Sequence, residues 1–309
     1  MWKLKVLVQF ILSWLPFGEA INHGLQRLRN SFRGGTERQI RNRFRPICNG
    51  LHKIEDYKRL DGASVVEVGT GWTPVVTFLL YGVGASEIFT YDHIRHLRER
   101  WGRLTVKVIF DHLDEIVRLL DLRTVDGDRV GGRISRIAQS DAPFFDTLER
   151  NGINYLAPGD AAATALPDGT IDILYSHAVL EHVPEKDVRR LVREAKRVLR
   201  PDGIFYALIG LHDHYSGFDR KVSRVNFLRY PEWLWAFFIK NSISYHNRMR
   251  EVDFLEILES QGAEIVKVWS GVDAEALRRV KAMKVDKRFA KYTDEQLAVT
   301  RTEIIARFP

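Results

Sequence analysis

The segment Val65–Pro74 has the residue types of a strand that leads into a ligand-binding turn. Its apolar β-branched run is followed by Gly69 and Gly71, and glycine permits unusual backbone angles and a close approach by a ligand. A dinucleotide-binding turn needs a third glycine where Pro74 stands, so the phosphate-binding version is incomplete. The segment therefore predicts either a cofactor-binding turn or a plain connection from a strand to a helix.

Asp92 ends the next apolar run, Glu87–Tyr91, and follows Gly69 by 23 residues. A carboxylate there can accept hydrogen bonds from both hydroxyls of a ribose. Asp92 could also be the N-cap of a helix, the residue before a first turn that contains Ile94. In an open α/β sheet, ligands bind beyond the carboxyl ends of the central strands. The residues that we expect at such ends are Gly69–Gly71, Asp92, Asp160 and Ser176–His177.

A second chemical signal is the run His212-Asp213-His214, which follows the apolar run Gly203–Ile209. If this run is extended, the two histidines lie on one face, and a histidine near a carboxylate can take the proton of a hydroxyl group. Two such histidines with Asp219 could instead hold a metal ion, or the segment could only hydrogen-bond its own loop. We take His214, helped by Asp213 or His212, as the candidate catalytic base, and we expect no metal.

Strand and helix patterns alternate along the chain, which predicts an α/β fold with a parallel, doubly wound sheet. The clearest helix is Val188–Leu199, and a helix is expected to open at Pro74. The predicted strands are Ser64–Val68, Glu87–Tyr91, Gly152–Leu156, Ile171–Ser176, Gly203–Ile209, Ala263–Trp269 and Thr300–Arg307.

The domain organisation predicted from these patterns is a basic helical arm at residues 1–60 and one domain at 61–309. Two helical insertions, at about 93–151 and 211–250, are expected to cover the cofactor cleft, because long insertions are usually lids or binding loops. The first has a polar, glycine-rich turn at Gly127–Gly132. The second holds nine of the 34 aromatic residues, so its stretch Phe227–Phe238 could form either a pocket wall or a buried amphipathic helix.

Positive charge is concentrated in the arm. Residues 1–60 hold 12 Lys and Arg against 4 Asp and Glu, whereas the remaining chain is nearly neutral, so nucleic acid is an unlikely partner. The apolar run Val6–Phe17 is too short to span a bilayer. One interpretation of this run is that residues 1–35 form an arm that docks on a membrane surface or a protein partner. A second is a helix packed on its own domain, and a cleaved signal peptide is a weaker alternative. The lone Cys48 indicates a reducing compartment, so we expect a cytoplasmic protein that the arm could hold at a membrane.

The order of these motifs resembles that of the class I S-adenosylmethionine-dependent methyltransferases, which have a Rossmann-like sheet. The resemblance covers roughly residues 62–270 without the insertions. It is carried by Glu67-x-Gly69-x-Gly71, Asp92, Gly159-Asp160-Ala161, LPDGTIDILYSHAVLEHV (166–183) and AKRVLRPDG (195–203).

This resemblance implies that the turn borders the methionine part of S-adenosylmethionine, Asp92 binds the ribose, Asp160 and Ala161 contact the adenine, and Ser176 and His177 line the sulfonium side. Thr73 stands where the family often has a further glycine, which puts the methionine end in doubt. His182 is expected to belong to a short structural helix. The cofactor-binding residues that we expect are Glu67, Gly69, Thr70, Gly71, Asp92, His93, Asp160, Ala161, Ser176 and His177.

The expected reaction is methyl transfer to a hydroxyl oxygen of a small molecule or glycan. Together with the start of the chain, the segment Asp213–Asp219 resembles methyltransferases associated with polysaccharide and glycoconjugate biosynthesis. One alternative is a non-catalytic cofactor-binding or scaffold protein. The other is a nucleic-acid methyltransferase, against which the fourth strand lacks the Asn/Asp-Pro-Pro-Tyr/Phe element of base-methylating enzymes.

Overall fold

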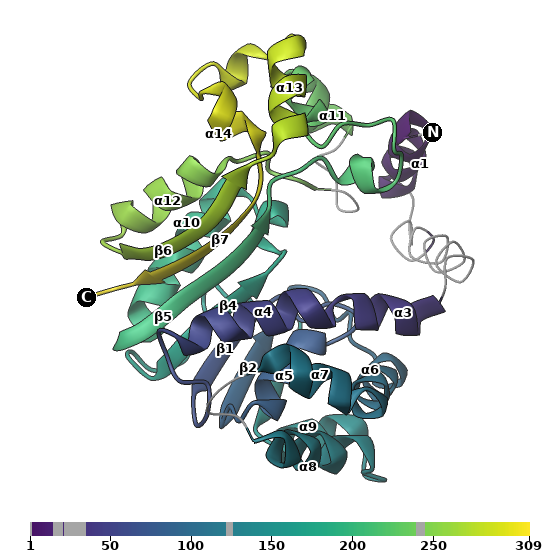
Figure 1. Ribbon diagram of the computed structural model, residues 1–309, viewed down its shortest axis with the longest axis vertical. Helices are drawn as coiled ribbons and strands as arrows, with labels where there is room; N and C mark the ends of the chain where they lie inside the picture. Colours follow the sequence, from purple (N-terminus) through teal and green to yellow (C-terminus); the bar gives the residue numbers. More distant parts are fainter. Residues whose placement is uncertain (1, 15–20, 22–34, 122–125, 239–244) are drawn as a thin grey trace.

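The computed structural model describes residues 2–14, 21, 35–121, 126–238 and 245–309 (Figure 1). Its centre is a seven-stranded sheet with the order β3-β2-β1-β4-β5-β7-β6. The strands are β1 (Ser64–Val68), β2 (Glu87–Tyr91), β3 (Ile153–Leu156), β4 (Ile171–His177), β5 (Leu199–Gly210), β6 (Glu264–Val272) and β7 (Val299–Arg307). All seven predicted strands are therefore present, with shifts at their ends.

Neighbouring strands from β1 to β5 are parallel, as predicted. The last strand differs, because β7 lies between β5 and β6 and is antiparallel to both. From β1 the chain proceeds outward to β2 and β3 on one side, and then to β4 and β5 on the other. The direction of winding thus reverses between β1 and β4, which is where ligands bind in doubly wound sheets.

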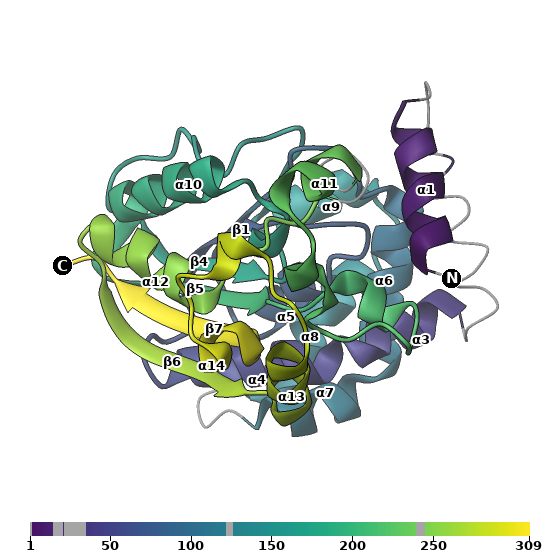
Figure 2. The ribbon, with the colours of Figure 1, turned by 90° about the horizontal axis from the view of Figure 1, so that it is seen from above.

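Helices cover both faces of the sheet (Figure 2). One face carries α10 (Glu185–Val198) and α12 (Glu251–Ser260), whose apolar sides pack on Leu174 and Phe205 of the central strands. The opposite face carries α4 (Phe44–Glu55) and α5 (Val75–Gly82) together with the helices of the first insertion. Pro74 is the residue before α5 and not its first helical residue.

The first insertion is helical, as predicted. Its helices are α6 (Glu99–Asp111), α7 (Leu113–Leu120), α8 (Gly127–Ala138) and α9 (Phe144–Arg150). The turn predicted at Gly127–Gly132 is wrong, because α8 begins there. Asp126 caps this helix by accepting a hydrogen bond from the Asp128 amide at 3.0 Å, and Val130 and Ile134 bury its apolar side. A cap and a buried face thus outweigh the low helix propensity of three glycines.

The second insertion is less helical than predicted. It forms the short turns η2 (His214–Gly217) and η3 (Asn226–Arg229) and the helix α11 (Glu232–Phe238), and residues 239–244 lie outside the described part. Buried arginines bind carbonyl groups of this insertion and of the chain beyond it. Arg248 donates to the carbonyl oxygens of Phe227 and Tyr230. Arg250 donates to the carbonyl oxygens of Leu211, Leu297 and Val299.

A third apolar cluster joins this insertion to the C-terminal part of the chain. The elements in that part are α13 (Ala274–Ala282), η4 (Lys287–Phe289) and α14 (Asp294–Ala298). The stretch Phe227–Phe238 packs partly into this cluster, and its role as the wall of an acceptor pocket stays a prediction. Phe227 and Trp235 are buried, whereas Trp233 and Phe237 are exposed.

The N-terminal region contains α1 (Trp2–Ser13), α3 (Gly35–Asn42) and α4. Helix α4 packs into the main core with Phe44, Ile47 and Leu51 fully buried, whereas α1 lies at the side of the molecule (Figures 1 and 2). The sequence also predicts helix breaks at residues 16–18, 33–35 and Pro46. Residues 16–18 and 33–34 lie outside the described part, Gly35 begins α3, and Pro46 lies in the first turn of α4, so the break expected there is wrong. Among the described helices, none has both the length and the apolar character needed to span a membrane.

Candidate functional site

The turn after β1 has the backbone that its glycines predict. Gly69 has φ +86° and Gly71 has φ +67°, angles that favour glycine. A Cβ at Gly69 would lie 2.5 Å from a methyl group of Val179, so this glycine lets the turn pack against the segment after β4. No described heavy atom lies within 4 Å of a Cβ built at Gly71. The backbone at Gly71 therefore faces space that a ligand can enter.

Asp92 connects this turn to the end of β2. Its carboxylate accepts a hydrogen bond from the Gly71 amide at 2.9 Å, and its backbone carbonyl accepts one from the Gly159 amide at 2.9 Å. The residues after it do not form a helix, so Asp92 does not have the alternative role of a helix cap. The Nδ1 atom of exposed His93 lies 3.6 Å from the second carboxylate oxygen. Asp92 thus joins the ends of β1, β2 and β3.

Asp160 lies after β3, as expected, but its carboxylate has partners already. One oxygen accepts a hydrogen bond from the Ala162 amide at 2.8 Å, and the other forms an ion pair with Arg190 of α10 at 2.9 Å. Both members of this ion pair are about half exposed. A ligand that uses Asp160 must therefore compete with Arg190.

These strand ends surround a cleft of about 350 Å³. Five of the ten predicted cofactor-binding residues line it, namely Gly69, Asp92, His93, Asp160 and Ala161. His93 is the only described residue of the first insertion in this lining, so the helices α6–α9 do not line the cleft. The expectation that this insertion covers the cleft is not met.

The other predicted cofactor-binding residues are not in the cleft lining. Glu67 is 2 % exposed and accepts a hydrogen bond from the Thr77 hydroxyl at 2.5 Å; burial raises the pKa of its carboxyl group to about 7. Thr70 is buried and bonds to Thr90 at 2.6 Å. Gly71 has the open space described above. Burial lowers the pKa of His177 to about 3, so this imidazole is neutral at pH 7. The hydroxyl of Ser176 has no hydrogen-bond partner among the described residues.

At the end of β5, the run His212-Asp213-His214 is not extended, because His214 begins η2. Asp213 is 1 % exposed and accepts hydrogen bonds from the Tyr215 amide at 2.8 Å and the Asn226 side chain at 3.2 Å. Burial raises the pKa of Asp213 to about 6. These contacts give Asp213 a role in shaping the loop, while its role toward His214 stays a prediction.

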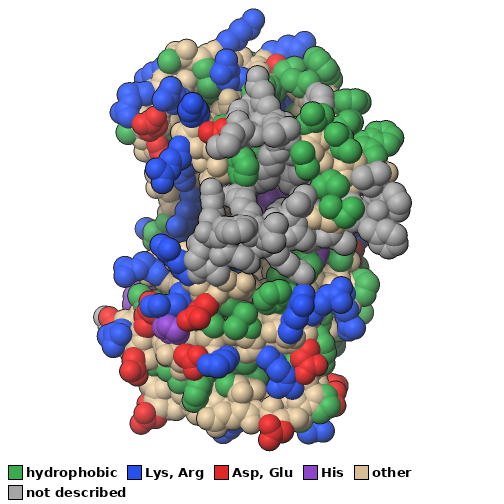
Figure 3. All heavy atoms as spheres, turned by 90° about the vertical axis from the view of Figure 1, so that its right-hand side faces the viewer, with side chains coloured by type: hydrophobic (Ala, Val, Ile, Leu, Met, Phe, Trp, Pro, Cys, Tyr) green, Lys and Arg blue, Asp and Glu red, His purple; other side chains and the backbone are tan. Residues whose placement is uncertain are grey.

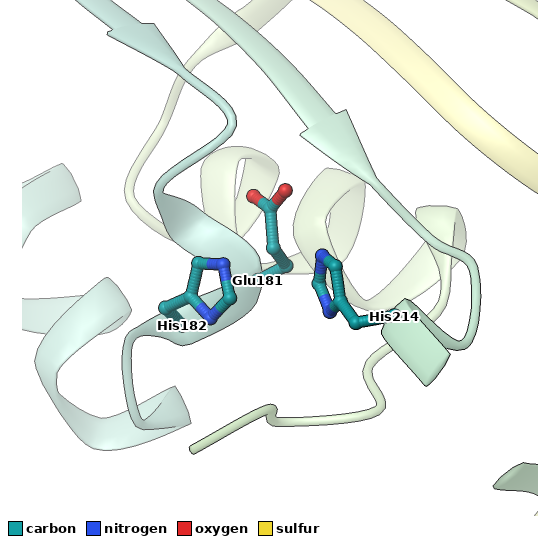
Figure 4. Close-up of side chains that lie close together, drawn as sticks. All are labelled: Glu181, His182 and His214. Carbon is teal, nitrogen blue, oxygen red and sulfur yellow. The ribbon is translucent and has the colours of Figure 1, made fainter. Parts of the chain in front are cut away.

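His212 and His214 belong to a group of side chains that we call the histidine cluster: His182, His212, His214 and His246 with Glu181. Figure 4 shows three of its members, Glu181, His182 and His214. The rings of His182 and His214 are stacked with centroids 4.8 Å apart. Those of His212 and His246 lie 5.1 and 4.6 Å from that of His214. Burial lowers the pKa of His182, His212 and His246, which favours the neutral imidazole.

The sequence analysis missed several residues of this site. His182 does lie in a short helix, η1 (Leu180–His182), but it also lines the cleft and belongs to the cluster. His246 lies 32 residues beyond His214, and no local spacing relates the two. Arg190 was missed because an exposed basic residue on an amphipathic helix has no distinctive signal.

The cleft fits the cofactor that the resemblance implies in two respects. Gly71 is outside the cleft lining, but the open space beside it leaves room for a ligand next to the turn. Asp92 is in the lining, and its carboxylate provides acceptors at the place expected for a ribose. Such a pocket volume is within the range of small-molecule sites.

Comparison with known families gives one match. Residues 137–207 match a family described as "Methyltransferase domain", which spans β3, β4, α10 and most of β5. No protein among the curated ones matches the chain.

Several solved structures are similar in part. An S-adenosylmethionine-dependent methyltransferase from Mesorhizobium loti is 18 % identical, with a TM-score of 0.43 over 81 % of this chain and 92 % of that one. A methyltransferase from Methanosarcina mazei is 14 % identical, with a TM-score of 0.43 over 83 % of this chain and 96 % of that one. A geranyl diphosphate C-methyltransferase from Streptomyces coelicolor was solved with S-adenosyl-L-homocysteine. It is 11 % identical, with a TM-score of 0.44 over 84 % of this chain and 78 % of that one. At these TM-scores the likeness carries no argument about substrates.

The mixed sheet with helices on both faces is consistent with the Rossmann-like class I methyltransferase fold. The family match includes β3, β4 and α10, which contribute Gly159–Ala162, His182 and Arg190 to the cleft, whereas Asp92 and the glycine turn lie outside the matched residues. Together these findings support a methyltransferase with S-adenosylmethionine as its cofactor.

Proposed function

We propose that this methyltransferase transfers a methyl group to a hydroxyl oxygen of a small molecule or glycan. The observation that carries the proposal is the position of His182. This residue lines the cleft and also stacks on His214, so the histidine cluster adjoins the cofactor site. An acceptor placed against the cluster would have an imidazole beside its hydroxyl group.

The cofactor supplies an electrophilic methyl group on a positively charged sulfur with a good leaving group. The chain then has to align the acceptor, exclude water and remove one proton. In the proposed step the acceptor oxygen bonds to the methyl carbon, the bond from that carbon to sulfur breaks, and the hydroxyl proton moves to His214. A neutral imidazole is the form of histidine that can take this proton.

The experiment measures transfer from cofactor carrying an isotope-labelled methyl group to a panel of sugars, glycans and small alcohols. We expect one labelled methyl group on oxygen, and a reaction rate that rises with pH until the catalytic imidazole is neutral. Labelling on carbon or nitrogen would overturn the choice of acceptor atom. Cofactor binding without turnover on any acceptor would favour the scaffold alternative.

The same proposal includes a docking surface for an anionic membrane. The exposed apolar side chains Leu7 and Ile11 of α1, and Trp14 directly after it, lie on the side of the molecule where α11 presents Trp233 and Phe237. Phe10 of α1 contacts Phe237 with ring centroids 5.0 Å apart, so the two helices share this surface. Figure 3 shows hydrophobic side chains gathered in the upper part of this side. The positive surplus of the N-terminal 60 residues suits an anionic lipid surface.

Flotation with vesicles tests this surface. The full chain should bind vesicles of anionic lipid but not neutral ones, and binding should weaken as salt rises. Trp233→Ser with Phe237→Ser should reduce binding, whereas Val272→Ser, at another exposed apolar position, on β6, should not. A chain without residues 1–35 should lose vesicle binding and keep its cofactor. If that chain aggregates or loses the cofactor, the arm is part of the fold and the docking proposal fails.

A further inference from the structure

Three side chains of the histidine cluster are arranged as metal ligands. Glu181 and His182 come from η1 after β4, and His214 comes from η2 after β5. One potential ligand atom of each lies within 4.8 Å of those of the other two. A tetrahedral ion with bonds of about 2.1 Å needs ligand atoms about 3.4 Å apart, so small side-chain rotations would close the site. Figure 4 shows the Glu181 carboxylate above and between the two imidazole rings.

The hydrogen bond of His182 leaves the correct nitrogen for a metal. Its Nδ1 atom lies 2.9 Å from the carbonyl oxygen of Tyr245, which can only accept a hydrogen bond. The proton must therefore be on Nδ1, and Nε2 keeps its lone pair. Metal-binding histidines are commonly oriented by such a bond from the other ring nitrogen.

Glu181 gives an independent indication that a ligand is missing. Its side chain is 2 % exposed, and one oxygen accepts a hydrogen bond from the Gly210 amide at 3.1 Å. The other oxygen, Oε2, is buried without a hydrogen-bond partner among the described residues. An unpartnered buried acceptor costs roughly 1–3 kcal/mol, more when it is charged. A cation bound to Glu181 would remove this cost.

The two other histidines of the cluster also have buried side-chain atoms without a partner among the described residues. His212 Nδ1 and His246 Nε2 are also buried without a hydrogen-bond partner in the described part of the chain. Their rings lie beside that of His214, at 5.1 and 4.6 Å between centroids. An ordinary aromatic stack would explain the ring contacts, but it would not explain a buried carboxylate oxygen with no donor. The combination of lone pairs and a carboxylate is typical of a cation site.

We propose that Glu181, His182 and His214 bind a first-row divalent cation of the Zn²⁺ type. Two imidazoles and one carboxylate favour such ions over Mg²⁺ and Ca²⁺, which prefer oxygen ligands. Three protein ligands also leave a coordination position open for another molecule. The sequence pattern suggests Asp219 as the third ligand if the two histidines bind a metal. In the structure, Asp219 Oδ1 accepts a hydrogen bond from the Lys221 amide at 3.1 Å. Asp219 is not part of the group formed by Glu181, His182 and His214.

The role of the cation rests on the proposed O-methylation. In the open position it binds the acceptor hydroxyl and lowers the pKa of that group. The hydroxyl proton passes to His212, the oxygen bonds to the methyl carbon, and the carbon–sulfur bond breaks with its electron pair left on sulfur. With the cation bound, His214 is a ligand, so the cation and His212 take over the task assigned to His214 in the metal-free scheme.

The test begins with direct binding of Zn²⁺ to the full chain. The chain is stripped with a chelator, and Zn²⁺ affinity is measured by competition with a chromophoric chelator; Co²⁺ absorption then reports the ligand set. We expect one ion per chain, with binding weakened at least tenfold in Glu181→Gln and in His214→Gln. His52→Gln, a change of an exposed histidine on α4, is the matched control and should bind like the unchanged chain.

Thermal unfolding of the stripped variants shows whether they fold, and Glu181→Gln keeps an oxygen that can accept the Gly210 hydrogen bond. No stoichiometric Zn²⁺ binding, or binding that both variants leave unchanged while they stay folded, overturns the site. Zn²⁺ binding without methylation of any hydroxyl acceptor keeps the site and rejects the proposed function. Full O-methylation by a chain that binds no metal keeps the function and rejects the site.

Discussion

The cleft at the ends of β1–β3 and the histidine cluster at the ends of β4 and β5 are built in different ways. In the cleft, two backbone amides pair with Asp92, since Gly71 donates to its carboxylate and Gly159 to its backbone carbonyl. In the cluster, three buried side-chain atoms, on Glu181, His212 and His246, have no hydrogen-bond partner among the described residues. The carboxylates of Asp92 and Asp160 at the cleft thus already have partners, whereas the cluster keeps buried polar atoms without a partner in the described part of the chain.

This difference indicates how the two regions divide the reaction. A site whose polar groups are already paired can bind a cofactor with little rearrangement, which lowers the cost of binding. A site with unpaired buried groups gains most when a ligand arrives, because each unpaired group is costly. Changes in the cleft should therefore alter cofactor affinity, and changes in the cluster should alter turnover.

The largest effect is expected from the cluster. His214→Ala should lower turnover by about 10²- to 10⁴-fold, the usual contribution of a positioned acid–base group. Cofactor affinity should stay nearly the same, because His214 is not among the residues that line the cleft. The measurements are kcat with a saturating acceptor and cofactor titration by calorimetry.

His52→Ala is the control for the general effect of losing an imidazole. If His214→Ala keeps full turnover, the cluster has a structural role and the comparison fails. If it loses cofactor affinity as much as turnover, the two regions are not separate.

Sequence patterns predicted the sheet well because each strand is a local apolar run. The runs at Val65–Val68 and Ile171–Ser176 are buried on both sides, which leaves a continuous apolar signal. The prediction failed at Gly127–Gly132, where a cap and the burial of Val130 outweigh local propensity. It could not foresee that β7 runs antiparallel, because strand order depends on how distant segments pack.

The site was predictable only where one short segment supplies it. Gly69, Gly71 and Asp92 each stand at the end of a recognisable strand. The cluster draws on three separate segments, and His246 reaches it from beyond the second insertion. Its burial depends on packing against Phe227 and Trp235, which no local pattern encodes.

A second prediction concerns Glu67, which lies behind the cleft. Burial raises the pKa of this carboxyl group from 4.5 to about 7, so the folded chain holds the proton more tightly than the unfolded chain. Glu67 should therefore contribute a decrease in stability of the cofactor-free chain as pH rises through this window, of about 2 to 3 kcal/mol between pH 5 and pH 8. Glu67→Gln cannot titrate, and should lack this decrease.

Urea unfolding of both chains at the two pH values measures the difference. Thr77→Val is a useful comparison, because it removes the hydroxyl that donates to Glu67 without removing the carboxyl group. Equal pH dependence of the unchanged chain and Glu67→Gln would show that Glu67 is not the titrating group.

The third prediction concerns the acceptor for the ribose. Asp92→Ala should weaken cofactor binding by about 10- to 100-fold, because hydrogen bonds to a charged acceptor contribute about 1.5–3 kcal/mol. Turnover at saturating cofactor should change much less. Asp92→Asn keeps one acceptor oxygen and should give a smaller loss in calorimetric titration. An unchanged affinity in Asp92→Ala would place the cofactor elsewhere.

The smallest effect is expected at the rim of the cleft, where Arg190 and Asp160 form an exposed ion pair at 2.9 Å. If Asp160 contacts the adenine, Arg190 competes with the cofactor for the same carboxylate. Arg190→Gln should then tighten cofactor binding, by less than about fivefold because exposed ion pairs are weak. Asp160→Ala should weaken binding, and in that background Arg190→Gln should have no effect, since there is no carboxylate left to release. Added salt should imitate Arg190→Gln by screening the pair. A loss of affinity in Arg190→Gln would mean that the guanidinium, and not the Asp160 carboxylate, contacts the ligand at this end of the cleft.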